Sequence, residues 1–146
     1  NLICKLINRF KHFNFIITYP NFDIGHDYII KKFKDISTPN YNVNFHKSLG
    51  DKMYLSVLKH CDVMIGNSSS GFTEAPYFKT PVVNIGSRQQ YRESSSNVIN
   101  VSHSFEEIYN ATVTQINYGR YPCSNHLGDG NSGKKMCQIL KLGICQ

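Results

Sequence analysis

The sequence has no tryptophan, no CxxC pair and no apolar run long enough to cross a membrane, which takes about eighteen residues or more. Without such a run we expect a cytoplasmic protein that does not bind membranes. No charged and then apolar leader opens the chain, which starts at Asn1 rather than at methionine. We expect this start to be the edge of a fragment with material missing upstream.

Cysteine is present, but in an odd number and without metal-binding spacing. The five residues are Cys4, Cys61, Cys123, Cys137 and Cys145. This pattern argues against a disulfide framework and against a structural zinc site. No HxxxH or HExxH motif occurs either, so we expect no metal, no cofactor and reduced thiols.

Basic residues outnumber acidic ones, with 16 Lys and Arg against 10 Asp and Glu and a formal net charge of +6. Such a balance suits anionic ligands. The cations are scattered, and the one tight cluster is Lys31, Lys32 and Lys34. No basic stripe interleaved with aromatic residues is present, so we expect no nucleic-acid binding.

Short apolar runs alternate with helical patterns along the whole chain. We expect strands at residues 13–20, 41–47, 62–66, 81–86 and 97–101, each preceded by a helix, and two helices at the end. Ser104 and Glu107 have the spacing of a capping box at the start of the first of these two helices. This order predicts one α/β domain over residues 1–146, a Rossmann-like doubly wound parallel sheet that binds ligands beyond the carboxyl ends of its strands.

The stretch GNSSSGFTEAP, residues 66–76, follows the third expected strand. Gly66 and Gly71 would let the backbone turn tightly, and the amides and hydroxyls of Ser68, Ser69 and Ser70 would face an anion at the start of a helix. The same serines would also suit an ordinary helix-capping turn. Both interpretations remain open on the pattern alone.

Glu74 lies about one turn into the helix that follows the serines. Its carboxylate could accept hydrogen bonds from a ribose diol, or it could simply favour the first turn of a helix. Pro76 predicts that this helix is short or kinked. The chain has no GxxxxGK[ST] motif, which excludes an ATP-hydrolysing P-loop.

Three other strand ends carry polar groups. Arg88 follows the fourth strand, where it could bind phosphate oxygens or remain a solvated loop cation. Asn21 follows the first strand and could contact a nucleoside, whereas Asp23 is a typical turn residue. The backbone at Ser48 and Leu49, after the second strand, could meet the edge of a base. No spacing supports a catalytic dyad.

The motifs SLG, GNSSSGFTEAP, NIGSRQ and GDGN, in this order, resemble the UDP-N-acetylglucosamine 2-epimerase family. They are most similar to its hydrolysing branch, which releases N-acetylmannosamine and UDP for the synthesis of sialic-acid-type sugars. The resemblance implies a GT-B architecture of two Rossmann-like halves, of which this chain is the C-terminal, UDP-binding half. It further implies roles for individual residues: Ser68, Ser69, Ser70 and Gly71 at the diphosphate, Glu74 at the ribose, Arg88 near the UDP, and Asn21, Ser48 and Leu49 near the nucleoside.

The resemblance also implies that the catalytic carboxylates belong to an N-terminal half that this sequence lacks. The chain alone would then bind UDP without turnover, and the complete enzyme would act on UDP-N-acetylglucosamine as a homo-oligomer. Two alternative functions of the chain stay open. It could be one half of a nucleotide-sugar glycosyltransferase, or a non-catalytic nucleotide-binding module.

Overall fold

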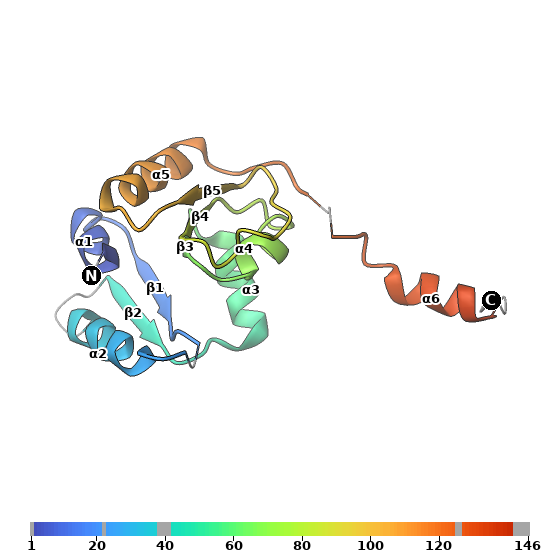
Figure 1. Ribbon diagram of the computed structural model, residues 1–146, viewed down its shortest axis with the longest axis horizontal. Helices are drawn as coiled ribbons and strands as arrows, with labels where there is room; N and C mark the ends of the chain where they lie inside the picture. Colours follow the sequence, from blue (N-terminus) through green and yellow to red (C-terminus); the bar gives the residue numbers. More distant parts are fainter. Residues whose placement is uncertain (1, 22, 38–41, 125–126, 142–146) are drawn as a thin grey trace.

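The computed structural model describes residues 2–21, 23–37, 42–124 and 127–141. The helices are α1 (Leu2–Arg9), α2 (His26–Ser37), α3 (Gly50–His60), α4 (Ser70–Thr73), α5 (Phe105–Tyr118) and α6 (Ser132–Lys141) (Figure 1). The strands are β1 (Phe15–Thr18), β2 (Val43–His46), β3 (Met64–Gly66), β4 (Val82–Ile85) and β5 (Val98–Val101). All five expected strands are present near their predicted positions.

Every strand pair is parallel, which confirms the parallel α/β class. The strands form two ladders in place of the single sheet that the alternation predicted: β1 pairs with β2, and β3, β4 and β5 pair in that order. In the second ladder Gly66 lies opposite Asn84, and Asn84 lies opposite Asn100. The carboxyl ends of β3, β4 and β5 therefore reach the same edge.

Each ladder has an apolar cluster of its own. Ile7, Phe33 and Val43 pack together on the β1–β2 ladder, and a second cluster of Leu58, Ala75 and Val82 packs on the β3–β5 ladder. α1 contacts α5 and joins the two parts (Figure 1).

In the part of the chain that the structure describes, the expected alternation is wrong at the connection from β4 to β5. Residues 87–96 form bends and turns with no helix. Their sequence, SRQQYRESSS, contains no apolar residue other than tyrosine, so a helix there would have no stripe to bury. Its serines also compete for backbone hydrogen bonds and so disfavour helices. This polar loop instead lies at the carboxyl edge of the second ladder.

The expected capping box at α5 is also wrong. Ser104 is the N-cap residue of α5, but its side chain makes no capping hydrogen bond. Glu107 instead accepts hydrogen bonds from the amide of Ser102 at 2.8 Å and from its hydroxyl at 2.9 Å. The carboxylate reaches two residues further back than the motif predicts, because Ser102 offers two donors at once.

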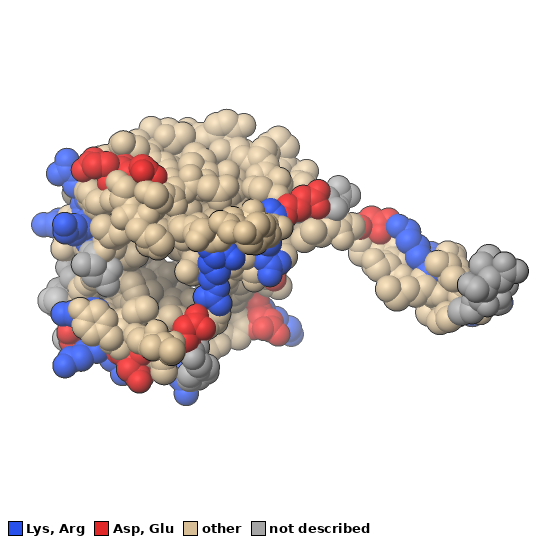
Figure 2. Space-filling model, in the orientation of Figure 1, with Lys and Arg blue, Asp and Glu red and all other residues tan. Residues whose placement is uncertain are grey.

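Helix α6 extends away from the rest of the chain (Figure 1), and Met136, Ile139 and Leu140 on it are exposed. None of the helices in the described part of the chain is long and apolar enough to span a membrane. In the view of Figure 2, basic and acidic side chains alternate over the surface without a continuous basic stripe.

Candidate functional site

The candidate site begins at the carboxyl end of β3, with a turn that we call the serine turn (residues 67–70). Gly66 has a φ of +152°, a conformation that favours glycine, and the chain changes direction there. The turn leads into α4, which contains only four residues. The prediction from Pro76 that this helix is short is therefore confirmed.

The three serines of the turn differ in exposure. Ser68 is exposed, Ser69 is half-buried and Ser70 is buried. Ser68 Oγ accepts a hydrogen bond from the amide of Ser70 at 3.3 Å, and Ser70 Oγ accepts one from the hydroxyl of Tyr54 at 2.6 Å. Ser70 is thus fixed to the protein interior, and the outward face of the turn belongs to Ser68 and Ser69.

The outward face offers hydrogen-bond donors. Within the described residues, neither the amide of Ser68, the amide of Ser69 nor the hydroxyl of Ser69 has a hydrogen-bond acceptor. A helix of one turn has little macrodipole, so these groups themselves must supply the attraction for an anion. Three donors on two adjacent residues suit the oxygens of a phosphate group.

Gly71 has a different role from the one that its pattern predicted. It is not among the glycines with positive φ, so the turn does not require glycine there. A Cβ atom at Gly71 would lie 2.8 Å from Val82 Cγ1, and the amide of Gly71 already donates to Ser68 O at 3.3 Å. Glycine at this position allows α4 to pack closely on β4.

Glu74 lies at the C-cap of α4 and is half-buried. The hydroxyl of Thr73 donates a hydrogen bond to its carboxylate. Burial raises the pKa of the Tyr54 phenol, and the negative charge of Glu74 adds to that rise. Glu74 is therefore near enough to Tyr54 for its charge to act on the phenol.

A cavity of about 230 Å³ lies at the carboxyl ends of β1 and β2, and we call it the β1–β2 pocket. It is lined by Thr18, Tyr19, Lys47, Ser48, Leu49, Gly50, Asp51 and Tyr54. Ser48 and Leu49, which the sequence analysis predicted near a nucleoside, line this pocket, whereas Asn21 is exposed and is not one of the lining residues. Lys47 adds a cation that the sequence pattern did not single out.

Tyr54 connects this pocket with the serine turn. Its side chain lines the β1–β2 pocket, and its hydroxyl binds Ser70 Oγ. The sequence analysis missed Tyr54, because in the helical pattern of α3 it is one more large residue beside an apolar face. Tyr54 therefore links the wall of the β1–β2 pocket to the start of α4.

Arg88 lies on the loop after β4, and its Nη1 donates to Asp23 Oδ2 at 3.0 Å. Both side chains are largely exposed, so the pair adds little to stability. The contact joins the loop after β1 with the loop after β4, across the two ladders. The structure thus brings together two residues that the sequence analysis had placed at the same rim.

Gln89, next to Arg88, is buried with 6% of its surface exposed. Its Nε2 donates to the carbonyl oxygen of Asn67 at 2.9 Å, and its Oε1 accepts from Arg92 Nε at 2.6 Å. Gln89 therefore fixes the backbone at the start of the serine turn. No sequence signal distinguishes it from its neighbour Gln90.

The fold and the site define a parallel α/β protein with a polar candidate binding surface at the carboxyl ends of its strands, the usual location of ligands in this class. The sequence profile of one family, UDP-N-acetylglucosamine 2-epimerase, matches residues 1–141. The chain belongs to this family.

Individual relatives agree with the family match. The chain is 37% identical over 122 residues to a UDP-N,N'-diacetylbacillosamine 2-epimerase (hydrolyzing) from Legionella pneumophila. The alignment covers 84% of this chain and 32% of the relative. It is 28% identical over 119 residues to a UDP-N-acetylglucosamine 2-epimerase from Neisseria meningitidis, covering 82% of this chain and 31% of the relative. It is also 38% identical over 100 residues to the polysialic acid biosynthesis protein P7 of Escherichia coli, covering 68% of this chain and 25% of the relative. The chain thus spans a third or less of the length of these relatives.

Proposed function

We propose that this chain is the UDP-binding part of a hydrolysing UDP-N-acetylglucosamine 2-epimerase. The observation that carries the proposal is the outward face of the serine turn, where the amides of Ser68 and Ser69 have no acceptor within the described residues. In a family named for a UDP-sugar substrate, a diphosphate is the natural acceptor for these donors. The hydrolysing branch is supported by the name of the Legionella relative.

Other residues around the turn extend the binding surface to the rest of the nucleotide. The β1–β2 pocket holds the uracil and meets it with the backbone at Ser48 and Leu49. Glu74 accepts hydrogen bonds from the ribose hydroxyls between that pocket and the serine turn. Asn21 and Arg88 complete the rim. The guanidinium is fixed by Asp23, and its remaining N–H groups, which bind no other described residue, face the nucleotide.

In this proposal the chain binds and orients the leaving group of the reaction. Epimerisation with hydrolysis removes the proton at C2 of the sugar, expels UDP and then adds water, so UDP must be held while its bond to the sugar breaks. Ser68 and Ser69 would stabilise the negative charge that develops on the departing diphosphate. The carboxylates that transfer protons belong to the part of the enzyme that this chain does not span, so the chain alone binds UDP without turnover.

A calorimetric titration with UDP and UMP tests the proposal. Wild-type chain is expected to bind UDP more tightly than UMP, and Ser68→Ala/Ser69→Ala is expected to weaken UDP binding at least about tenfold, since each lost hydrogen bond to a charged group removes about 1.5–3 kcal/mol. The matched control, Ser56→Ala/Ser94→Ala, changes two serines outside the turn and is expected to bind as wild type does.

Two results would contradict the proposal. A folded wild-type chain that binds no UDP would exclude an independent UDP site. Equal binding of UDP and UMP would remove the diphosphate from the serine turn. UDP binding that is unchanged by the double substitution, which removes both hydroxyls and keeps both amides, would exclude the serine hydroxyls from the site.

A further inference from the structure

An ion pair joins two loops that follow strands of different ladders. Asp23 lies after β1 and Arg88 lies after β4, and Arg88 Nη1 donates to Asp23 Oδ2 at 3.0 Å. A carboxylate beside a site for an anion repels that anion. Asp23 is therefore a residue whose effect on the ligand must come through Arg88, because its own charge opposes binding.

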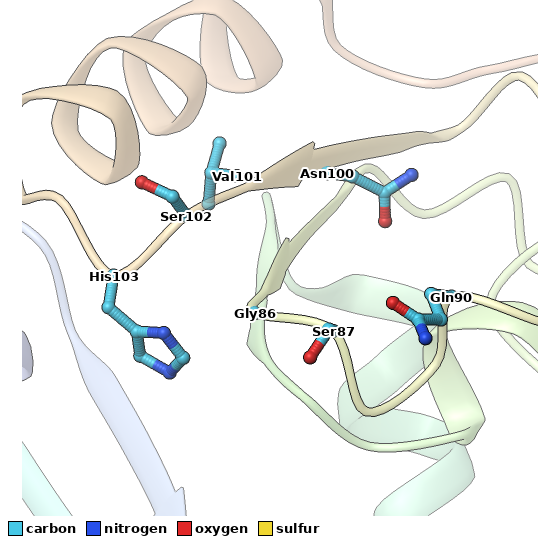
Figure 3. Close-up of a pocket in the computed structure, with 7 residues that line it drawn as sticks. All are labelled: Gly86, Ser87, Gln90, Asn100, Val101, Ser102 and His103. Atoms are coloured by element: carbon cyan, nitrogen blue, oxygen red, sulfur yellow. The ribbon is translucent and has the colours of Figure 1, made fainter.

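The backbone that carries Arg88 is held on both sides. Before it, Gly86 has a φ of +79°, and a Cβ atom on Gly86 would lie 2.6 Å from His103 Cε1. The loop therefore leaves β4 directly against this imidazole (Figure 3). After it, the amide of Gln90 donates to Ser87 O at 3.0 Å and closes a turn around Arg88. The position from which the arginine side chain starts is thus well defined.

The same loop places Arg88 beside the serine turn. Gln89, the next residue, is buried, and its Nε2 donates to Asn67 O at 2.9 Å. Consecutive Cα atoms are about 3.8 Å apart, so the long side chain of Arg88 starts one residue away from a fixed contact with this turn. A phosphate group held by Ser68 and Ser69 is within the reach of such a side chain.

The backbone of Asp23 is also held by hydrogen bonds. Its amide donates to Asn21 O at 2.8 Å, and its carbonyl oxygen accepts from the amide of His26 at 3.1 Å. His26 Nδ1 lies 3.2 Å from the same carbonyl oxygen. Asp23 therefore presents its carboxylate to Arg88 from a hydrogen-bonded turn.

The guanidinium keeps one side for a ligand. Asp23 contacts Nη1, and Nε and Nη2 make no hydrogen bond to a described residue. These two nitrogens form a planar pair of donors that matches two oxygens of a phosphate group. An arginine that is already held also loses less side-chain entropy when it binds a ligand.

We infer that Asp23 is a positioning residue, which holds Arg88 so that Nε and Nη2 bind the diphosphate at the serine turn. This inference rests on the proposed function and deepens it. The side chain of Asp23 is 67% exposed, so water and salt screen its repulsion of the anion. The guanidinium binds the anion at hydrogen-bond distance, and its contribution exceeds that screened repulsion. A carboxylate that merely competed with the diphosphate for Arg88 would have the opposite effect on affinity.

The test measures the affinities for UDP and uridine by calorimetry in two variants. Asp23→Ala removes the acceptor of Arg88 and is expected to weaken UDP binding about two- to tenfold, the range expected from the entropy of one long side chain. Asp23→Asn keeps an uncharged acceptor and is expected to lose less. Uridine has no phosphate group and is expected to bind both variants as it binds wild type.

Asp27→Ala is the matched control. It removes an equal charge four positions away, where the carboxylate lies 3.2 Å from His26 Nε2 and not beside Arg88. Without a positioning role, only the repulsion of the anion is lost, so UDP affinity is expected to stay the same or to rise slightly.

A double-mutant cycle completes the test. In an Arg88→Ala background, Asp23→Ala is expected to cause no further loss of UDP affinity, because the residue that it positions is absent.

Three results would overturn the inference and leave the proposed function intact. These are UDP affinity that is unchanged or higher in Asp23→Ala, an equal loss of UDP and uridine affinity, and a loss that persists in the Arg88→Ala background. A folded wild-type chain that binds no UDP would overturn both the inference and the proposed function.

Discussion

The hydroxyl of Tyr54 donates a hydrogen bond of 2.6 Å to Oγ of Ser70, across sixteen positions of sequence. Tyr54 comes from α3 and Ser70 begins α4, so the contact fixes the serine turn to the helix that borders the β1–β2 pocket. Because Ser70 is 7% exposed, an unpartnered hydroxyl there would cost free energy.

The substitution Tyr54→Phe tests this contact, since it removes the hydroxyl and keeps the ring. We expect UDP affinity to fall about two- to tenfold, in line with the roughly 0.5–1.5 kcal/mol of one hydrogen bond, and uridine affinity to remain unchanged. Calorimetry with both ligands measures the two effects.

Tyr77→Phe is the control for Tyr54→Phe, because the hydroxyl of Tyr77 also makes a hydrogen bond of 2.6 Å but to Gly128 O. It is expected to lower stability without changing UDP affinity. If Tyr54→Phe weakened uridine and UDP equally, its hydroxyl would serve the pocket and not the turn.

Gln89→Ala tests the second attachment of the serine turn. The substitution removes the donor to Asn67 O and the acceptor for Arg92, and we expect it to lower the free energy of unfolding by about 1–3 kcal/mol and to weaken UDP binding. Chemical denaturation and calorimetry measure the two. Gln138→Ala, at an exposed position of α6, is the control and is expected to change neither the free energy of unfolding nor the UDP affinity. Unchanged UDP binding in Gln89→Ala would show that the turn keeps its shape without Gln89.

Gly71→Ala tests the close packing of α4 on β4. The new methyl group would lie 2.8 Å from Val82 Cγ1, and Val82 is 3% exposed and has little room to move. We expect a loss of about 1–3 kcal/mol in the free energy of unfolding, as is typical of overpacking, with partial recovery in Gly71→Ala/Val82→Ala.

Gly133→Ala is the matched control for Gly71→Ala, since a Cβ atom on Gly133 meets nothing within 4 Å. Alanine is favoured over glycine in a helix by about 1 kcal/mol, so this variant is expected to be neutral or more stable. Thermal unfolding that showed no difference between the two variants would refute the packing role of Gly71.

The contact between Ser102 and Glu107 predicts a dependence of stability on pH. Hydrogen bonds from the amide and the hydroxyl of Ser102 lower the pKa of Glu107 below its ordinary value of 4.5. A carboxylate whose pKa is lower in the folded chain stabilises the fold above the unfolded pKa, and this contribution disappears as pH falls through the folded pKa.

We therefore expect the difference in unfolding free energy between wild type and Glu107→Gln to be largest near neutral pH and to become smaller below pH 4.5. Denaturation at a series of pH values measures it. Glu106→Gln, at the next position, is the control and is expected to follow wild type. A difference that stayed constant down to low pH would show that Glu107 stabilises the fold without its charge.

The sequence predicted the elements whose signals are local. Apolar runs located all five strands, and Pro76 predicted the short α4. It failed at the capping box of α5, where two local partners competed for the same carboxylate. Glu107 bonded to Ser102 instead of Ser104, because the donors of Ser102 reach it only in the folded chain.

The candidate site shows the same limit. The serine turn was recognisable from its residues, and Ser48 and Leu49 do line a pocket. Tyr54 and Gln89 were not recognisable, because their roles depend on partners 16 and 22 positions away. A tyrosine or a glutamine in the sequence does not by itself predict which residue it will bind.

Because no helix connects β4 and β5, the serine turn and the loop after β4 are held in place in different ways. The serine turn is held by α3, α4 and β4, so a change there disturbs packed elements. Ser87 and Gln90 lie on a polar loop that no apolar stripe anchors, and loops tolerate substitution better than the elements they connect. Substitutions at Ser87 and Gln90 are therefore expected to leave the packing of α3, α4 and β4 around the serine turn unchanged.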